Sequence, residues 1–463
     1  MSSPNAPAEL AAHVTGPVFD GADPRSATET AGFNLAVTHR PAVVVGATRS
    51  ADVAAAVRYA AEARLPVAVQ ATGHGAVRPA DGAVFVSTAR MQGVHVDPRR
   101  RIARVQPGVR WRAVIDAAAP HGLAPLSGSS SGVGVVGYTL GGGVGHLARR
   151  HGFAADHVRA VDLVTADGEH STVTAESDPE LFWAIRGGKG NFGIVTALEF
   201  DLVPVPRFFG GSLLFGADDA AHVLHSFAAW APTLPESATT SVALLRLPDL
   251  PSVPEPLRGR FTLALRFAYC GSAKDAEQLL APMRSVARPL MGAVGPMRYR
   301  DVDRIHMDPT EPMPGVHDGG LLRAFSAEVV DALLGAAGPD VDVPLVMAEV
   351  RLLGGALGRP ADVPNAVAGR EGAYSLFAVA PAPPPLAHIA PEVTRSVLAA
   401  LSPWTTGTTL LNFLGHAPTP EDVGSAWPTA TLDRLRRVKG RLDPVNLFST
   451  GHAIAPAALA GAR

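Results

Sequence analysis

The sequence predicts a multidomain protein built from mixed helices and strands, and three observations support this. From Pro41 onward, short apolar segments of strand length alternate with segments of helical periodicity. Pro204 and Pro206 then interrupt the pattern, which indicates a domain boundary. Residues 207–430 return to alternating strands and helices. At roughly 100–200 residues per domain, 463 residues allow two or three domains.

The elements before Pro204 follow from apolar runs bounded by turn residues. Residues 43–46 form a short apolar run that predicts a buried strand, and Ser50 can cap a helix extending through Arg64. Pro66 stops this helix, because proline cannot continue it. Further strands are expected at 67–70, 84–87, 94–97, 102–105, 158–166, 171–175 and 194–202, and further helices at 111–121 and 178–185.

The second half is punctuated by proline-rich loops. Strands are expected at 261–269 and 345–352. A helix is expected at 273–281, where Pro282 should end it. A last helix is expected at 430–440.

Composition and charge exclude several classes of protein. Hydrophobic residues make up 47% of the chain and charged residues 18%, which suffices for a large core. The net charge of −2 offers no basic field for nucleic acid or an anionic membrane. Cys270 is the single cysteine, so no intrachain disulfide can form. We see no signal peptide and no apolar run of membrane-spanning length, and we expect a cytoplasmic protein.

The first motif is Gly73-His74-Gly75, directly after a predicted strand. The two glycines remove side-chain bulk, so that backbone amides can approach a phosphate or a flat ring. The imidazole would then point into that space. An alternative interpretation is a turn histidine that happens to lie between glycines.

The second motif is a glycine-rich run from Ser127 to Gly145 with eight glycines and four serines. Successive backbone N–H groups of such a run can surround a pyrophosphate. Interleaved apolar residues such as Val135 and Leu140 argue against a flexible linker. The run lacks the spacing of a Rossmann fingerprint and the Gly-Lys-Ser/Thr of a P-loop, and no spacing typical of metal ligands occurs.

These segments together resemble the berberine-bridge-enzyme-like FAD-linked oxidases of the vanillyl-alcohol-oxidase and p-cresol-methylhydroxylase (PCMH) superfamily. The segment 66–74 resembles the strand and turn that present a flavin-linked histidine, and 137–143 resembles the cofactor loop, followed by 149–156. The segments 181–188 with 191–196, and 438–439 with 443–448, match the other hallmarks in the family's order.

The resemblance implies an α+β fold with a two-part FAD-binding domain. After a loosely packed lead-in at 1–35, the FAD domain would span 36–205 and be completed by the C-terminal segment 430–463. A substrate-binding domain at 206–429 would hold an antiparallel sheet backed by helices. The expected cofactor-binding residues are Gln70, Ala71, Thr72, Gly73, His74, Gly75, Ala76, Ser130, Gly132, Val133, Gly134, Val135, Thr139, Gly142, Gly145, Gly193, Val195 and Asn446.

The resemblance also implies covalent attachment of FAD through His74. Many members use a second link to a cysteine, and alignment on the cofactor loop places Ser130 at that position. Because serine cannot form the thioether, a single link is expected.

The family reaction transfers hydride to flavin N5 while a base takes a proton. Tyr374 is the favoured pocket and catalytic residue, although it can equally be a core aromatic of a strand. Glu349 is the second candidate; Glu349 and Arg351 share one strand face and either line the pocket or face solvent. Asn412 and Trp427 stand where relatives often place a catalytic tyrosine, and neither is a competent base.

Three further residues, His146, Tyr138 and His416, can lie near the flavin or serve as ordinary structural groups. No metal site is expected.

The implied function is an oxidase acting on a sugar, an alcohol or a natural-product intermediate of secondary metabolism. In the family, a valine three positions after the usual cysteine goes with dioxygen as acceptor, and counting from Ser130 gives Val133. The alternatives are a flavin-dependent dehydrogenase and a cyclase without net redox change. The expected partners are a small-molecule substrate and dioxygen.

Overall fold

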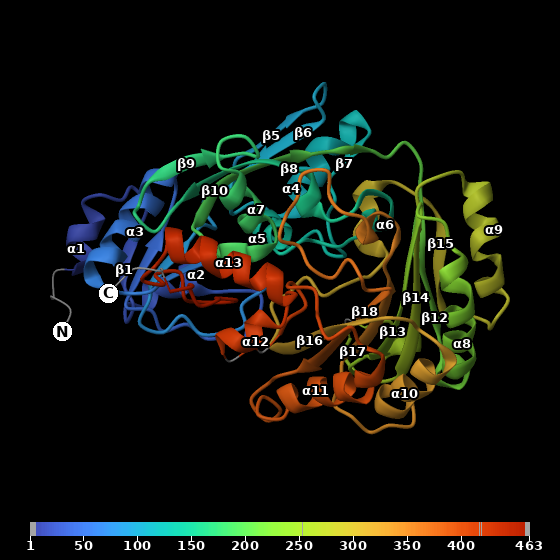
Figure 1. Ribbon diagram of the computed structural model, residues 1–463. Helices are drawn as coiled ribbons and strands as arrows, with labels where there is room; N and C mark the ends of the chain where they lie inside the picture. The colour runs from blue at the N-terminus through green and yellow to red at the C-terminus, as the bar shows by residue number, and fades with distance from the viewer. Residues whose placement is uncertain (1–5, 252, 416, 418, 459–463) are drawn as a thin grey trace.

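The computed structural model describes residues 6–251, 253–415, 417 and 419–458. Helices, one mixed sheet and otherwise antiparallel sheets form an α+β fold, as predicted from the sequence. Two smaller sheets lie at one end of the molecule and a seven-stranded sheet at the other, with the glycine-rich segments between them (Figure 1). Among the described residues, no helix is both long and apolar enough to cross a lipid bilayer.

The first sheet has four strands in the order β1-β2-β4-β3, with β2, β4 and β3 parallel. Its strands are β1 (Val18–Asp20), β2 (Val43–Gly46), β3 (Val67–Gln70) and β4 (Val84–Ser87). Helix α3 (Ser50–Ala63) buries Val53, Val57 and Ala60, as its periodicity predicts. Ser50 lies inside the helix and is not its cap, and Arg64 follows it in the left-handed conformation.

Residues 6–35 are not the loose lead-in that the sequence suggested. They include α1 (Ala6–Ala11), β1, which pairs with β2, and α2 (Ala27–Thr30). Glu29 is 5% exposed and bonds Arg90, and Gly32 touches Gly73. The segment therefore helps to position the turn that carries His74.

The second sheet is antiparallel with the order β5-β6-β10-β8-β9. Its strands are β5 (Val94–Asp97), β6 (Ile102–Val105), β8 (Val158–Val164), β9 (His170–Val173) and β10 (Ile194–Asp201). A short pair, β7 (Leu123–Ala124) and β11 (Val203–Pro204), extends this region. The helices are α4 (Trp111–Ala118), α5 (Val135–Leu140), α6 (Ala148–His151) and α7 (Pro179–Gly188).

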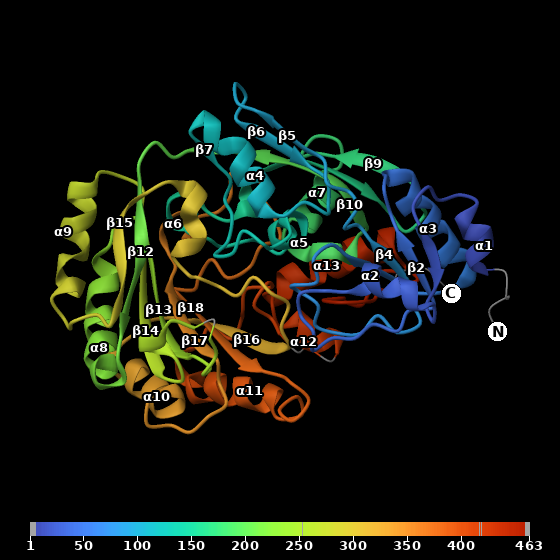
Figure 2. The same ribbon diagram turned by 180° about the vertical axis from the view of Figure 1, so that it is seen from behind.

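The third sheet is antiparallel with the order β15-β12-β14-β13-β17-β18-β16. Its strands are β12 (Phe208–Phe215), β13 (Ala238–Arg246), β14 (Phe261–Tyr269), β15 (Met291–Met297), β16 (Gly315–Leu322), β17 (Met347–Leu352) and β18 (Tyr374–Pro381). Helices α8 (Ala220–Trp230), α9 (Ala273–Arg284), α10 (Ala327–Ala337) and α11 (Ala390–Ala400) cover its outer face (Figures 1 and 2).

Helix α9 differs from the sequence prediction. Pro282 does not end it, and the helix continues to Arg284. Proline lies in the last turn, where its missing N–H removes only one of the helical hydrogen bonds.

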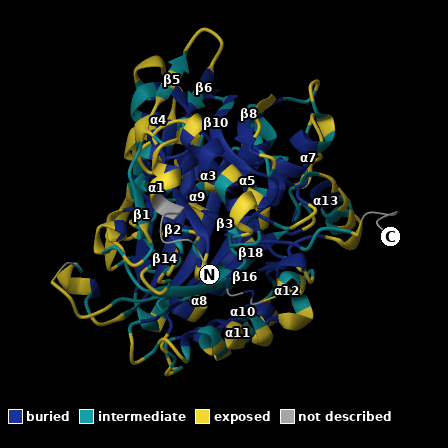
Figure 3. Ribbon diagram, turned by 90° about the vertical axis from the view of Figure 1, so that its left-hand side faces the viewer, coloured by how far each residue is buried: buried dark blue, intermediate teal, exposed yellow. Residues whose placement is uncertain are grey.

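The C-terminal segment returns to the N-terminal sheets after α12 (Pro420–Gly424) and α13 (Thr429–Leu442). Lys439 Nζ donates to the backbone oxygens of Asn191 and Phe448, and its ion pair with Asp443 spans 3.1 Å. Leu447 O accepts a hydrogen bond from Val67 N. The buried residues concentrate at the centre of the molecule, whereas the outer faces of the helices are exposed (Figure 3).

Candidate active site

A cavity of about 1540 Å³ lies between the glycine-rich loops and the seven-stranded sheet. It exceeds the roughly 300–1,000 Å³ of an ordinary ligand pocket, so it has room for a large cofactor and a substrate together. The segments 67–78 and 128–144, with Lys189 to Asn191, line one side. Strands β13, β14, β16, β17 and β18 line the other.

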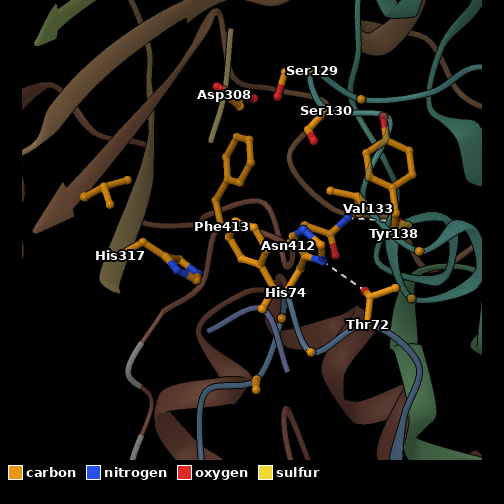
Figure 4. Close-up of a pocket in the computed structure, with 18 of the residues that line it drawn as sticks. Thr72, His74, Ser129, Ser130, Val133, Tyr138, Asp308, His317, Asn412 and Phe413 are labelled. Carbon is orange, nitrogen blue, oxygen red and sulfur yellow. Dashed lines mark hydrogen bonds between the residues drawn. The ribbon is translucent and has the colours of Figure 1, made fainter. Parts of the chain in front are cut away.

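His74 lies at the cavity wall, in the turn after β3. Its Nδ1 is 3.0 Å from Thr72 Oγ1 (Figure 4). Its ring stacks on Phe33 with centroids 4.0 Å apart. Burial, and then the charge of Arg110, lower the pKa of His74 to about 4. The imidazole is therefore neutral at physiological pH, and its Nε2 has no hydrogen-bond partner among the described residues.

The glycines beside His74 have different roles. Gly73 has φ +70°, and a Cβ there would lie 2.4 Å from Gly32 Cα, so only glycine fits. Gly75 lines the cavity, and a Cβ on it would meet open space. The same holds for Gly137 and Gly190. These three positions leave backbone accessible to a bulky ligand, which fits an FAD-sized cofactor.

Most of the residues expected to bind the cofactor line this cavity. They are Gln70, Ala71, Thr72, Gly73, His74, Gly75, Ala76, Ser130, Val133, Gly134, Gly193 and Val195. The Oγ of Ser130 accepts a hydrogen bond from Gly132 N, and Val133 O accepts one from Trp111 N.

Six of the expected cofactor residues do not line the cavity: Gly132, Val135, Thr139, Gly142, Gly145 and Asn446. Val135 and Thr139 are buried in α5, where Thr139 Oγ1 donates to Val135 O. A Cβ on Gly145 would lie 1.8 Å from Ser127 O, so this glycine is required by packing. Asn446 has φ +57° in the turn after α13.

The other two positions also have local explanations. Gly132 O accepts a hydrogen bond from Arg110 Nη1 at the rim of its loop. Gly142 has φ +104° and packs toward Val367 and Phe153.

On the sheet side, strand alternation decides which side chains reach the cavity. In β17, Met347, Glu349 and Arg351 line the cavity, while Ala348 and Val350 lie in the core beneath the helices. Glu349 and Arg351 therefore do not face solvent.

Glu349 accepts four hydrogen bonds. Its Oε1 lies 2.7 Å from Ser241 Oγ, 2.8 Å from Arg266 Nη1 and 3.2 Å from His306 Nε2. Its Oε2 lies 2.9 Å from Arg351 Nη2. Burial raises the pKa of Glu349, but Arg351 and Arg266 outweigh it and hold that pKa well below its ordinary value. Both carboxylate oxygens of Glu349 are therefore occupied by hydrogen bonds, and its lowered pKa makes it a poor base.

His146 belongs to the same cluster, at 3.0 Å between its Nε2 and His306 Nδ1. Burial lowers the pKa of both imidazoles. His306 and the charge of Arg351 lower the pKa of His146 further, and the charge of Arg266 lowers that of His306. His306 lines the cavity, whereas His146 lies behind it.

The expectation that Tyr374 faces the flavin is not met. Tyr374 is 3% exposed and does not line the cavity. Its ring packs against Phe325 at 5.6 Å, on the helix-covered face of β18 with Leu376 and Ala378. The neighbouring Phe377 and Val379 take the cavity face. Tyr374 is therefore the core aromatic that strand propensity alone would explain.

Asn412 lines the cavity, and its Nδ2 donates to Tyr138 O at 2.8 Å (Figure 4). Tyr138 also lines the cavity, and its buried hydroxyl has no partner among the described atoms. Trp427 is buried in the core away from the cavity. His416 lies outside the described residues.

Sequence reasoning missed several polar cavity residues. They are Lys189, Arg266, His306, His317 and His452. His317 lies in β16, where its ring points into the cavity (Figure 4). Burial, and then the charge of Lys189, lower the pKa of His317 to about 4. Burial lowers the pKa of Lys189 to about 7, and its Nζ lies 3.3 Å from His452 Nδ1. The one sequence feature that could have placed His317 and Arg266 at the cavity is the alternation of side chains between the two faces of a strand.

The fold and the cavity define a FAD-linked oxidoreductase. A family model described as an FAD binding domain matches residues 41–174. The chain is 29% identical over 437 residues to (R)-6-hydroxynicotine oxidase of Paenarthrobacter nicotinovorans, covering 90% of this chain and 92% of that protein.

Two solved structures share the fold. Physcomitrella patens BBE-like 1 superposes with a TM-score of 0.82 at 20% identity, over 95% of this chain and 97% of that one. The xylooligosaccharide oxidase from Myceliophthora thermophila, in complex with xylobiose, gives a TM-score of 0.82 at 22% identity, over 98% and 100%. The chain therefore contains an FAD binding domain, is similar to FAD-linked oxidases, and shares the fold of the berberine-bridge-enzyme-like, PCMH-type structures.

Proposed function

We propose that this protein is an oxidase whose FAD is attached through His74 and which oxidises a small molecule with dioxygen as acceptor. The substrate would be a sugar, an alcohol or a natural-product intermediate. FAD supplies the hydride acceptor. The observation that carries the proposal is His74, a neutral imidazole on the cavity wall with Nδ1 oriented by Thr72 and no partner on Nε2.

The surroundings of His74 favour attachment. A neutral imidazole is a nucleophile, and burial keeps it neutral. The stack on Phe33 and the hydrogen bond to Thr72 hold the ring in one orientation, which lowers the entropy cost of bond formation. The twelve predicted cofactor residues that line the cavity, from Gln70 to Val195, would hold the rest of FAD.

The test of attachment is denaturation. Wild-type protein unfolded in acid or denaturant should keep its flavin fluorescence on a gel, and His74→Ala should release its flavin. Ser130→Ala is the matched control, since it removes a polar cavity group and should leave the attachment unchanged. Release of the flavin from unfolded wild type would refute the covalent link.

For the proton, we assign the base to His317. Its ring has no hydrogen-bond partner among the described residues, and it lines the cavity as a neutral imidazole. His74 is assigned to the flavin, and the other cavity imidazoles are engaged in hydrogen bonds. His39 contacts Gln70 and Ala80 N, His306 contacts Glu349 and His146, and His452 contacts Leu414 O. As hydride leaves the substrate carbon, a ring nitrogen of His317 would take the proton from the adjacent heteroatom.

Two observations support dioxygen as acceptor. One relative that aligns along most of the chain is named an oxidase. Val133 lies at the cavity wall, where a larger side chain would fill space that dioxygen needs, because protein interiors are close-packed. The names of the relatives refer to a nicotine derivative and to xylooligosaccharides, so substrate class does not follow from the fold.

The Val133→Leu variant tests the acceptor. Stopped-flow reoxidation of the reduced enzyme by dissolved oxygen should be fast in wild type and strongly slowed in the variant, while flavin content stays the same. Ala76→Val, another enlargement at the cavity wall, is the control for bulk as such. Slow reoxidation of both wild type and Val133→Leu would replace the oxidase with a dehydrogenase.

A further inference from the structure

Two arginines and one glutamate meet on the cavity face of the seven-stranded sheet. Arg266 from β14 and Arg351 from β17 both bond Glu349, at 2.8 and 2.9 Å. The three side chains are 3–7% exposed, and all three residues line the cavity. This arrangement is a built, desolvated charge cluster and not a surface ion pair.

The cluster carries one positive charge too many. Two guanidiniums face one carboxylate. His306, which contacts Arg351 and Glu349, and His146 behind it are imidazoles and add no anion. Asp308 also lines the cavity, but it is half-exposed and makes no hydrogen bond or ion pair with either arginine. Because the two buried guanidiniums share one carboxylate, the cluster keeps an excess positive charge, and a buried excess charge is costly.

Arg266 still has an unused donor, whereas Arg351 Nη1 already donates to Val144 O at 3.3 Å. The Nε of Arg266 is buried without a hydrogen-bond partner among the described atoms, and its Nη1 is the atom that binds Glu349. Two aromatic rings lie beside the cluster. The Phe413 ring centroid is 5.9 Å from Cζ of Arg351, and the Phe377 ring is tilted against the Phe413 ring with centroids 4.4 Å apart. The cavity lining therefore combines a binding site for an anion with neighbouring aromatic side chains.

We propose that Arg266 and Arg351 bind a carboxylate of the substrate, so that the substrate is an acid with an apolar, preferably aromatic, body. A carboxylate supplies the missing negative charge and accepts charge-assisted hydrogen bonds from a guanidinium. The diphosphate of FAD does not fill this role, because the backbone left open for it, at Gly75 and Gly137, belongs to the opposite wall. That the bound acid is oxidised rests on the proposed function. That an acid binds at the two arginines does not depend on it.

The test uses acids and their neutral amides as unreactive ligands. The holoenzyme is titrated with benzoate, phenylacetate and 3-phenylpropionate, and with the three matching amides, while the flavin absorption bands are followed. At least one acid should bind about tenfold or more tightly than its amide. Arg266→Gln should lower the affinity for that acid by about 10- to 100-fold, which is the range of a hydrogen bond to a charged group. The affinity for the amide should not change.

Arg246→Gln is the matched control. Arg246 also lines the cavity, but its guanidinium binds the backbone oxygens of Ala337, Gly338 and Val341. This variant should keep the preference for acids.

Equal affinity for every acid and its amide in wild type, or no binding of any acid, would overturn the proposal without the need for a folded variant. It would also fail if Arg266→Gln lowered the flavin reduction potential while the acid preference stayed, because the charge would then serve the reduced flavin. Neither result bears on peroxide formation, so the oxidase proposal stands or falls separately.

Discussion

At the scale of single residues, the cavity shows how burial selects the protonation state of a side chain. His74 and His317 are both kept neutral by desolvation, with pKa values of about 4. Glu349 stays ionised despite burial, because Arg351 and Arg266 compensate for it. A base near neutral pH is therefore an imidazole of this cavity and not its carboxylate.

His317→Gln should slow flavin reduction by about 10²–10⁴-fold, the usual contribution of a general base. Since the pKa of His317 is lowered to about 4, the imidazole is already neutral at pH 5, and protonation removes the base only as pH falls through about 4. The reduction rate should thus be flat from pH 5 to 8 with saturating substrate. Anaerobic stopped-flow measurement across this range checks both points.

Tyr374→Phe provides the comparison, because its hydroxyl lies in the helix-covered core and should not affect the rate. A rate that rose with a midpoint near 6.5 would mean that His317 is not desolvated. An unchanged rate in His317→Gln would remove it from the reaction.

At the scale of elements, the sequence predicted where the strands lie, but it did not predict which side chains of a strand reach the cavity. Strands such as β2, β3 and β4 occur where expected, because each is a short apolar run bounded by proline, glycine or polar residues. The face of β18 was not predictable, since Tyr374 and Phe377 are both aromatic and only the pairing with β17 shows which one reaches the cavity.

The same limit applies to the cluster around Glu349. Arg266 and His306 are far from it in sequence, at separations of 83 and 43 residues. The strand order β14-β13-β17 brings Arg266 to Glu349, and the loop that begins at His306 brings the imidazole. The turn that carries His74 was easier to predict from the sequence, because its cavity residues, Gln70 to Ala76, are contiguous in the chain.

The return of the C-terminal segment depends on one buried ion pair. Lys439 and Asp443 are both 0% exposed, and Asp443 also accepts hydrogen bonds from Leu447 N and Phe448 N. Lys439→Met would leave a buried carboxylate without its cation and two backbone oxygens without a donor. We expect a loss of about 3–5 kcal/mol in the free energy of unfolding.

Denaturant unfolding followed by circular dichroism measures this loss. Lys274→Met is the control, because Lys274 is exposed on α9 and its replacement should change stability by less than about 0.5 kcal/mol. Similar midpoints for the two variants would contradict the role of the ion pair.

At the scale of the whole molecule, the cavity exists because its two walls are held together, and a buried arginine makes much of that connection. Arg149, in α6 between the cofactor loop and α7, is 6% exposed. Its guanidinium donates to backbone oxygens beside the seven-stranded sheet: Leu353 at 2.8 Å, Ala238 at 2.6 Å, Pro235 at 3.0 Å and Leu234 at 3.2 Å.

Arg149→Met should loosen the two walls before the rest of the chain unfolds. Methionine fills part of the volume but removes all four hydrogen bonds. Pro235 O keeps the hydrogen bond from Ala238 N, and each buried carbonyl oxygen that is left unpaired costs about 1–3 kcal/mol. Flavin fluorescence reports the opening of the cavity and circular dichroism reports the whole chain. In wild type the two thermal transitions should coincide, and in the variant the flavin signal should change at the lower temperature. Arg150→Met, next in sequence but exposed, should keep the two transitions together. Coincident transitions in Arg149→Met would mean that other contacts between the walls suffice, because only a local opening exposes the flavin early.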